Sequence, residues 1–155
     1  MRDFKISQDT RYPYAEFKFE NYHERRNGAQ RVHWSEPIVV EGISYRLKVH
    51  PNGWKRGEGT HISVGVQRSK LSSLNLDTCD RVYNVTRMVH SEDTQKDFED
   101  RSTTDWTDKG DICFITAEFY KIEDLAKDGF IHEDGSLRFI LFIKRHNFQT
   151  RLTEA

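Results

Sequence analysis

The sequence has few cysteines, no long hydrophobic run and almost no charge imbalance, and each shortage excludes a class of protein. No stretch approaches the roughly 20 apolar residues of a membrane-spanning helix, and the first ten residues lack the apolar core of a signal peptide. Two cysteines, Cys79 and Cys113, are too few for a disulfide framework, so we expect free thiols and a cytoplasmic location. A net charge of −1 argues against nucleic acid as a partner and against membrane insertion or adsorption.

Motifs of common catalytic and metal sites are also missing. The seven histidines are scattered, and none stands at metal-ligand spacing from a cysteine. No G-x-S-x-G motif and no cysteine–histidine signature of a nucleophile is present. We therefore expect no enzymatic activity, no catalytic residues, no metal and no cofactor.

What the sequence does contain is a series of short alternating stretches typical of β-strands. Residues 43–50, ISYRLKVH, are the clearest, because they send four apolar side chains inward and leave Lys48 and His50 facing outward. Only 120–129 looks helical, with Gly129 where a helix C-terminal glycine would stand. The other predicted strands are 14–20, 31–40, 60–66, 81–90, 111–119 and 136–145, of which the last is apolar on both faces, as a central strand would be.

These elements predict an all-β fold, an antiparallel β-sandwich of seven to eight strands with one short helix. The chain length of 155 residues fits a single domain. The alternation predicts a core made of Phe17, Phe19, Trp34, Tyr45, Leu47, Val49, Ile62, Val64, Phe114, Phe139 and Leu141.

The glycine-rich segment 51–59 raises the question of phosphate binding. A phosphate-binding loop is followed by a helix whose amides and dipole face the anion, but here the strand-like residues 60–66 follow. The Lys-Ser/Thr pair of a P-loop is also missing. The segment is therefore predicted to be a hairpin connection between two strands.

The segment 101–110, RSTTDWTDKG, places Trp106 among polar and charged residues, and we interpret it as a loop. From the residues alone, two explanations stay open. The indole either folds back onto the edge of the sandwich or stays exposed as an anchor for a ligand, because amphipathic tryptophans are enriched at binding sites.

Four segments, in order and with natural spacing, resemble the TRAF-type domain, which is also called the MATH (meprin and TRAF homology) domain. They are HWSEPIVVEG (33–42), SYRLKVHPNG (44–53), GEGTHISVGV (57–66) and GDICFITAEFYKIEDLAKDGFIHEDGSLRFILFIKR (110–145). The resemblance implies a β-sandwich domain over residues 14–146, preceded by an N-terminal extension, 1–13, and followed by a C-terminal tail, 147–155.

The resemblance also implies a function. Members of the family mostly bind short peptides of receptor or substrate proteins, which lie extended along a sheet edge in a shallow groove and add a strand. They occur in signalling adaptors and in ubiquitin-system proteins, both ligases and a deubiquitinase. The adaptors trimerise through a preceding coiled coil, so a homotrimer is expected only through segments not present in this chain.

The resemblance implies binding residues in this chain, position by position. Lys48, His50 and Trp54 match positions where the adaptors have Arg, Tyr and Asp that read an acidic peptide, and only the charge of Lys48 is kept. Gly65 stands where those proteins tend to have an aromatic residue. Arg56 falls within one residue of a groove arginine of the deubiquitinase-type domain.

The opposite wall of the expected groove comes from a later segment. Asp105 and Trp106 resemble an Asp-Trp pair that lines the groove in the deubiquitinase and ligase-receptor branches, and Ser102 and Thr104 precede this pair. An alternative from another class is a carbohydrate-binding β-sandwich in which Trp54 or Trp106 stacks on a sugar.

Overall fold

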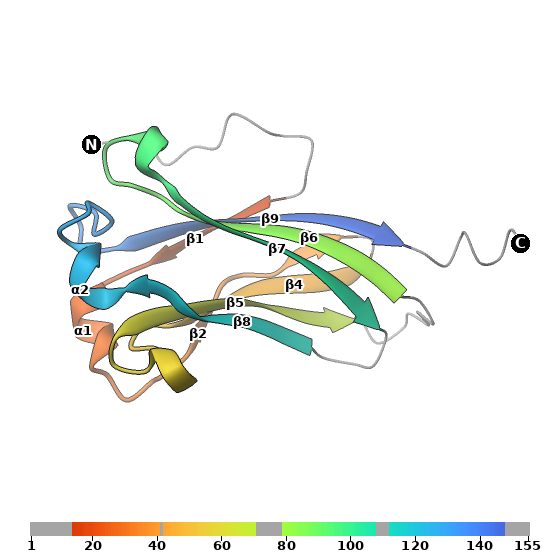
Figure 1. The fold of residues 1–155 in the computed structure, drawn as a ribbon, viewed down its shortest axis with the longest axis horizontal. Helices are drawn as coiled ribbons and strands as arrows, with labels where there is room; N and C mark the ends of the chain where they lie inside the picture. The colour runs from red at the N-terminus through yellow and green to blue at the C-terminus, as the bar shows by residue number, and fades with distance from the viewer. Residues whose placement is uncertain (1–13, 41, 71–78, 108–111, 148–155) are drawn as a thin grey trace, which may run out of the picture.

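The computed structural model describes residues 14–40, 42–70, 79–107 and 112–147. Within these residues, nine strands form two antiparallel sheets that pack face to face (Figure 1). The expected all-β sandwich is therefore confirmed. In the part of the chain that the structure describes, no helix is long and apolar enough to cross a membrane.

One sheet has four strands in the order β1-β9-β6-β7. Its interior strand β9 lies between β1 and β6, and its apolar residues are buried on both faces, as the sequence predicted for a central strand. The strands are β1 (Tyr14–Phe19), β6 (Cys79–Met88), β7 (Phe98–Thr107) and β9 (Leu137–Asn147).

The other sheet has the order β2-β4-β5-β8, and β3 also pairs with β4. Its strands are β2 (His33–Trp34), β3 (Ile38–Val40), β4 (Ile43–His50), β5 (His61–Lys70) and β8 (Ile112–Lys121). Strands β7 and β8 follow each other in the chain but belong to different sheets, and each is the last strand of its sheet. Ring contacts of Phe98 with Phe119 and Tyr120 bring these two edges together.

Short helices lie in the connections at one end of the sandwich: α1 (Tyr22–Arg26), η1 (Lys55–Gly57), η2 (Thr94–Lys96) and α2 (Ile122–Leu125). The helix expected at 120–129 is the short α2, and Gly129 follows it with a φ of 85° that favours glycine. Helix α1 was not expected, although its cap residue Asn21 is of a type favoured at helix N-termini. In the structure Asn21 makes no side-chain capping bond.

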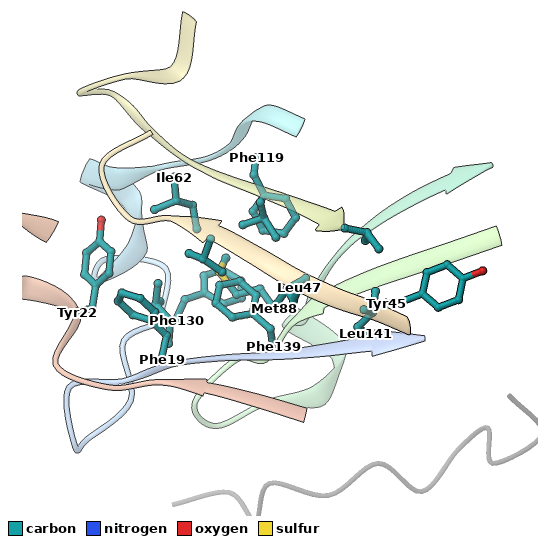
Figure 2. Packing of buried hydrophobic residues seen from close by; sticks show 14 of the residues in the cluster. Phe19, Tyr22, Tyr45, Leu47, Ile62, Met88, Phe119, Phe130, Phe139 and Leu141 are labelled. Atoms are coloured by element: carbon teal, nitrogen blue, oxygen red, sulfur yellow. The ribbon is translucent and has the colours of Figure 1, made fainter. Parts of the chain in front are cut away.

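The core lies between the sheets, where aromatic and branched side chains of both sheets pack together (Figure 2). Phe17 packs against this cluster half-buried. The fully buried members that the alternation predicted are Phe19, Tyr45, Leu47, Val49, Ile62, Val64, Phe139 and Leu141.

Two core predictions are wrong. Trp34 and Phe114 are 41% and 40% exposed. Phe114 belongs to the outermost strand β8, where a side chain has neighbours on one side only. Trp34 pairs with Lys48 and contacts Arg46, so it lies on the outer face of its sheet. Period-two alternation indicates which face a residue occupies, but it does not indicate how far its strand lies from the edge of the sheet.

The interpretation of 101–110 as a loop is also wrong for its first seven residues. Residues 98–107 form β7, whose backbone pairs with β6 and places Asp105 opposite Arg81 and Trp106 opposite Asp80. A polar sequence can form this strand because β7 is an edge strand that is bonded on one side only. Residues 108–110 lie outside the described residues.

Candidate functional site

The glycine-rich segment connects β4 to β5, which pair antiparallel, so the predicted hairpin connection is confirmed. The segment packs directly on β8. A Cβ added to Gly57 would lie 2.0 Å from the backbone oxygen of Ala117, a distance that no larger residue tolerates. The hydroxyl of Ser63 donates to the same oxygen at 2.6 Å and accepts from the backbone N–H of Trp54 at 2.8 Å. The loop is therefore fixed against β8, with Trp54 at the contact.

A groove of about 480 Å³ lies where this loop meets β8. Trp54, Lys55 and Arg56 line one side, and residues 114–117 line the other. The indole of Trp54 is 37% exposed, and the Lys55 ammonium lies 4.3 Å above the centre of its ring. Arg56 extends toward β8, where its Nε lies 2.9 Å from Oε1 of Glu118. An exposed aromatic ring with the Lys55 ammonium above it therefore lies at the groove, and Arg56 reaches from the same loop to β8.

Strand β8 offers an open edge at this groove. Among the described residues it has a neighbouring strand on its β5 side only, so its outer backbone groups stay available for another strand. Phe114 lies on this edge with 40% of its surface exposed. The site therefore combines unpaired backbone groups with an apolar contact surface.

Gly65 lies next to this edge and Lys48 one strand further in, both on the outer face of the five-stranded sheet. Paired residues form a row across the sheet, from Trp34 through Lys48 and Gly65 to Ile115. A Cβ on Gly65 would lie 2.7 Å from Cγ1 of Ile115 and 2.2 Å from the Phe114 backbone oxygen. Ile115 therefore fills the space that a side chain at position 65 would need, and glycine is the residue that permits this approach.

His50 does not face the solvent as expected. It is 7% exposed, because Trp54 of the following loop covers it, with the two ring centres 6.1 Å apart. Burial lowers the pKa of His50, and the positive charge of Lys48 lowers it further. His50 is therefore a neutral ring behind Trp54, and the alternation of β4 could not predict this cover.

Strand β7 lies alongside β8 on the side of the other sheet. Thr116 of β8 donates to Oδ2 of Asp100 at 2.7 Å and so links the two edges. Ser102 is half-buried and donates to Oδ1 of Asn84 at 2.9 Å. The backbones of Thr104, Asp105 and Trp106 continue β7, but their side chains lie outside the described ones, so the role expected of them stays a prediction.

The structure thus brings Trp54, Arg56, Lys48 and Gly65 around the middle of β8, at residues 114–118. Sequence reasoning missed Lys55, Phe114, Ile115 and Thr116 as parts of this site. A signal existed for two of them, since Phe114 and Ile115 belong to a run of four consecutive apolar residues, 112–115. Cys113 on the same strand is a free thiol as expected, whereas the side chain of Cys79 lies outside the described ones.

Metal chemistry finds no support in the part of the chain that is described, where no group of three or more His, Cys, Asp or Glu side chains could hold a metal ion. What the site offers is a strand edge, aromatic surface and cations.

The family model described as "MATH domain" matches residues 14–139. Mouse and human E3 ubiquitin-protein ligase TRIM37 are each 29% identical to the chain over 142 residues, which cover 90% of the chain and 14% of either relative. The chain therefore spans a small part of the length of these relatives. Notothenia coriiceps TRAF5 has a similar fold, with a TM-score of 0.66 and 15% identity over 85% of this chain and 73% of that one. These comparisons lend no support to the carbohydrate-binding alternative.

Proposed function

Because this chain belongs to the MATH domain family, we propose that it is a protein–protein interaction module for short extended peptides of receptor or substrate proteins. The peptide lies along β8 and adds a strand to the five-stranded sheet, held by backbone hydrogen bonds. The module works in the cytoplasm, in signalling or in the ubiquitin system, and has no catalytic activity of its own. Its similarity to a ubiquitin ligase over a small part of that protein supports the ubiquitin system in particular.

The observation that carries this proposal is the open edge of β8 beside exposed aromatic side chains. An unpaired strand edge is a template for another chain, and native proteins usually cover or shorten it. Here β8 is ten residues long, and Trp54 and Phe114 are exposed beside it. Aromatic residues of this kind supply most of the affinity in small interfaces.

Side chains of an added strand alternate between two directions, which gives each part of the site a role. Those that point to the outer face of the sheet meet Ile115, then Gly65 on the next strand and Lys48 on the strand after it. Those that point toward the other sheet meet β7. Trp54 is the anchor, His50 supports its ring from behind, and Arg56 forms the rim. The wall on β7 consists of Ser102, Thr104, Asp105 and Trp106.

A peptide held in this way has a few side-chain contacts and one row of backbone bonds. We expect a micromolar dissociation constant, about −8 kcal/mol, and no tight binding of nucleic acid. An array of short peptides, screened against the whole chain, would supply a ligand for the test below.

The test is an N-methyl scan of the selected peptide. Each backbone N–H is methylated in turn, and affinity is measured by titration calorimetry. Strand addition predicts that every second methyl group abolishes binding, because alternate N–H groups of an added strand point at β8. Uniform tolerance of methylation would contradict strand addition, and undiminished binding by a Trp54→Ala, Phe114→Ala double variant would contradict the location.

A further inference from the structure

A second cleft, of about 640 Å³, lies at the end of the sandwich where α1 and α2 are found (Figure 1). Its lining comes from α1, from the turn that leads into β5 and from the junction of β8 with α2. None of the residues assigned to peptide binding lines it. The cleft is therefore separate from the groove at β8.

Its walls are held in place by bonds to the body of the sandwich. The buried Tyr22 of α1 donates its hydroxyl to the backbone oxygen of Pro51 at 2.9 Å, and burial raises the pKa of this hydroxyl to about 12, so that it remains a donor. On the other side, the N–H of Ile122 donates to the backbone oxygen of Thr60 at 2.9 Å. Both walls are thus fixed before any ligand arrives, which lowers the entropic cost of binding.

Basic side chains dominate the lining. His23 and Arg26 come from α1, His61 begins β5, and Lys121 ends β8, whereas Glu123 is the single carboxylate in the lining. His61 and Lys121 stand directly opposite each other in the β5–β8 ladder. Two basic side chains opposite each other repel when both are charged, and the sheet gains nothing from placing them there.

These basic groups have no anionic partner among the residues that the structure describes. Arg26 donates from Nε to Oδ1 of Asn52 at 3.3 Å, which leaves its two terminal amino groups for another acceptor. No ion pair within the described ranges involves His23, Arg26, His61 or Lys121. The fold, and not pairing with acidic side chains, therefore places these basic side chains around one cleft.

The turn between the two walls leaves room for an anion. Gly59 has a φ of 81°, and a Cβ built on it would meet no atom within 4 Å. Beside it, the Thr60 hydroxyl donates to the backbone oxygen of Gly57 at 3.3 Å and lies 2.8 Å from Nδ1 of His61. Two imidazoles, a guanidinium and an ammonium suit a compact ligand with several acceptor oxygens and more than one negative charge.

We infer that this cleft binds a phosphate monoester, presented as a phosphoserine or phosphothreonine of a partner polypeptide. A carboxylate has two oxygens and one charge, whereas a phosphate monoester carries three acceptor oxygens and close to two charges at neutral pH, which matches the number of donors. The site is independent of the proposed peptide groove, so either proposal can fail alone.

The experiment is an NMR titration of the nitrogen-15-labelled whole chain. The probes are N-acetyl-phosphoserine methylamide, its unphosphorylated counterpart and inorganic phosphate. We expect the phosphorylated probe to shift the amides of Gly59, Thr60 and Ile122 in a saturable way. Lys121→Gln and Arg26→Gln should each weaken this binding about tenfold, as for the loss of one charge-assisted hydrogen bond.

Two matched variants control for overall charge. Lys127→Gln and Arg31→Gln remove exposed cations that do not line the cleft, and they should leave binding unchanged. Unperturbed core amides in each variant establish that it is folded. Equal binding of the unphosphorylated probe, tighter binding of inorganic phosphate than of phosphoserine, or equal losses in the control variants would each overturn the inference.

Discussion

The two edges of the five-stranded sheet are built in opposite ways. At one edge, β8 runs unbroken for ten residues. At the other edge, β2 and β3 have two and three residues, and Ser35, Glu36 and Pro37 separate them. Ser35 stays bonded to β4 through Leu47, with its N–H 2.9 Å from the Leu47 oxygen and its hydroxyl 2.8 Å from the Leu47 nitrogen. Short strands and a proline prevent pairing with another chain, and β8 has neither protection.

Each edge also has an exposed tryptophan, but the two indoles differ in their surroundings. Trp34 is 41% exposed and lies on the sheet, where its Nε1 donates to Oε1 of Gln67 at 2.7 Å and Arg46 and Lys48 flank its ring. Trp54 is 37% exposed and lines a groove. Exposure alone therefore does not identify a binding residue. An exposed ring can contact an added strand only where the neighbouring strand edge is open.

The largest expected effect comes from separating the hairpin loop from β8. In Gly57→Ala, the new methyl group must displace the Ala117 backbone, which lies 2.0 Å from its position. We expect the free energy of unfolding to fall by about 3 kcal/mol, as for a methyl group forced into a packed site. Urea denaturation measures this loss. Gly28→Ala is the control, because its nearest neighbour would lie at 3.4 Å, and it should change stability by less than about 0.5 kcal/mol.

The next prediction compares the two tryptophans directly. Trp54→Ala should weaken binding of a selected peptide by about 2 kcal/mol, roughly thirtyfold, while Trp34→Ala should leave affinity unchanged. Both variants should lose less stability than the ~3–5 kcal/mol of a buried tryptophan. Titration calorimetry and thermal melts provide the two readouts. An equal loss of affinity in both variants would show that the two edges do not differ in function.

A third prediction concerns the β7 side of the groove. Trp106→Ala should cost about 2 kcal/mol of peptide affinity, and Asp105→Ala about 1 kcal/mol through the loss of a hydrogen-bond acceptor. Stability should change much less, because the resemblance places Trp106 in the groove and not in the core. The same titrations and melts decide between the two explanations of Trp106. If Trp106→Ala unfolds the domain, this residue is structural and its assignment to the β7 side of the groove is wrong.

The smallest expected effect is a dependence of the free energy of unfolding on pH, to which one histidine near each edge contributes. Burial lowers the pKa of His50 behind Trp54, and burial together with Arg25 lowers the pKa of His33 on β2. A folded-state pKa below the ordinary value of about 6.5 means that the unfolded chain binds the proton more readily. The free energy of unfolding therefore has its full value above about pH 6.5 and falls as the pH drops toward the lowered pKa.

Urea denaturation at about pH 7.5 and about pH 5 measures this loss, which we expect to be below about 1 kcal/mol for each histidine. His50→Gln should remove one part of the pH dependence and His33→Gln the other. If both variants keep the full dependence of the original chain, neither edge contains the titrating group.

The fold could be predicted from the sequence wherever local pattern and burial agree. Residues 43–50 alternate because β4 buries one face and leaves the other partly exposed, and residues 139–143 are continuously apolar because β9 is interior and buried on both faces. The site was harder, because its residues depend on which strands are outermost. Phe114 looked like a core residue, Trp106 looked like part of a loop, and His50 looked exposed, since neither strand order nor the cover given by Trp54 is a property of a single segment.

The pairing of β1 with β9 has a consequence for how the chain folds. Tyr14 lies opposite Phe142, so the first and the last described strands are neighbours in the four-stranded sheet. A contact between residues so far apart in sequence is slow to form, which places folding in the range of milliseconds to seconds typical of sandwiches with non-local pairing. In the finished sheet β9 lies between β1 and β6, so neither strand can form its native pairing with β9 until β9 has been synthesised. A truncated chain that ends before Leu137 should therefore remain unfolded, however much of its sequence is intact.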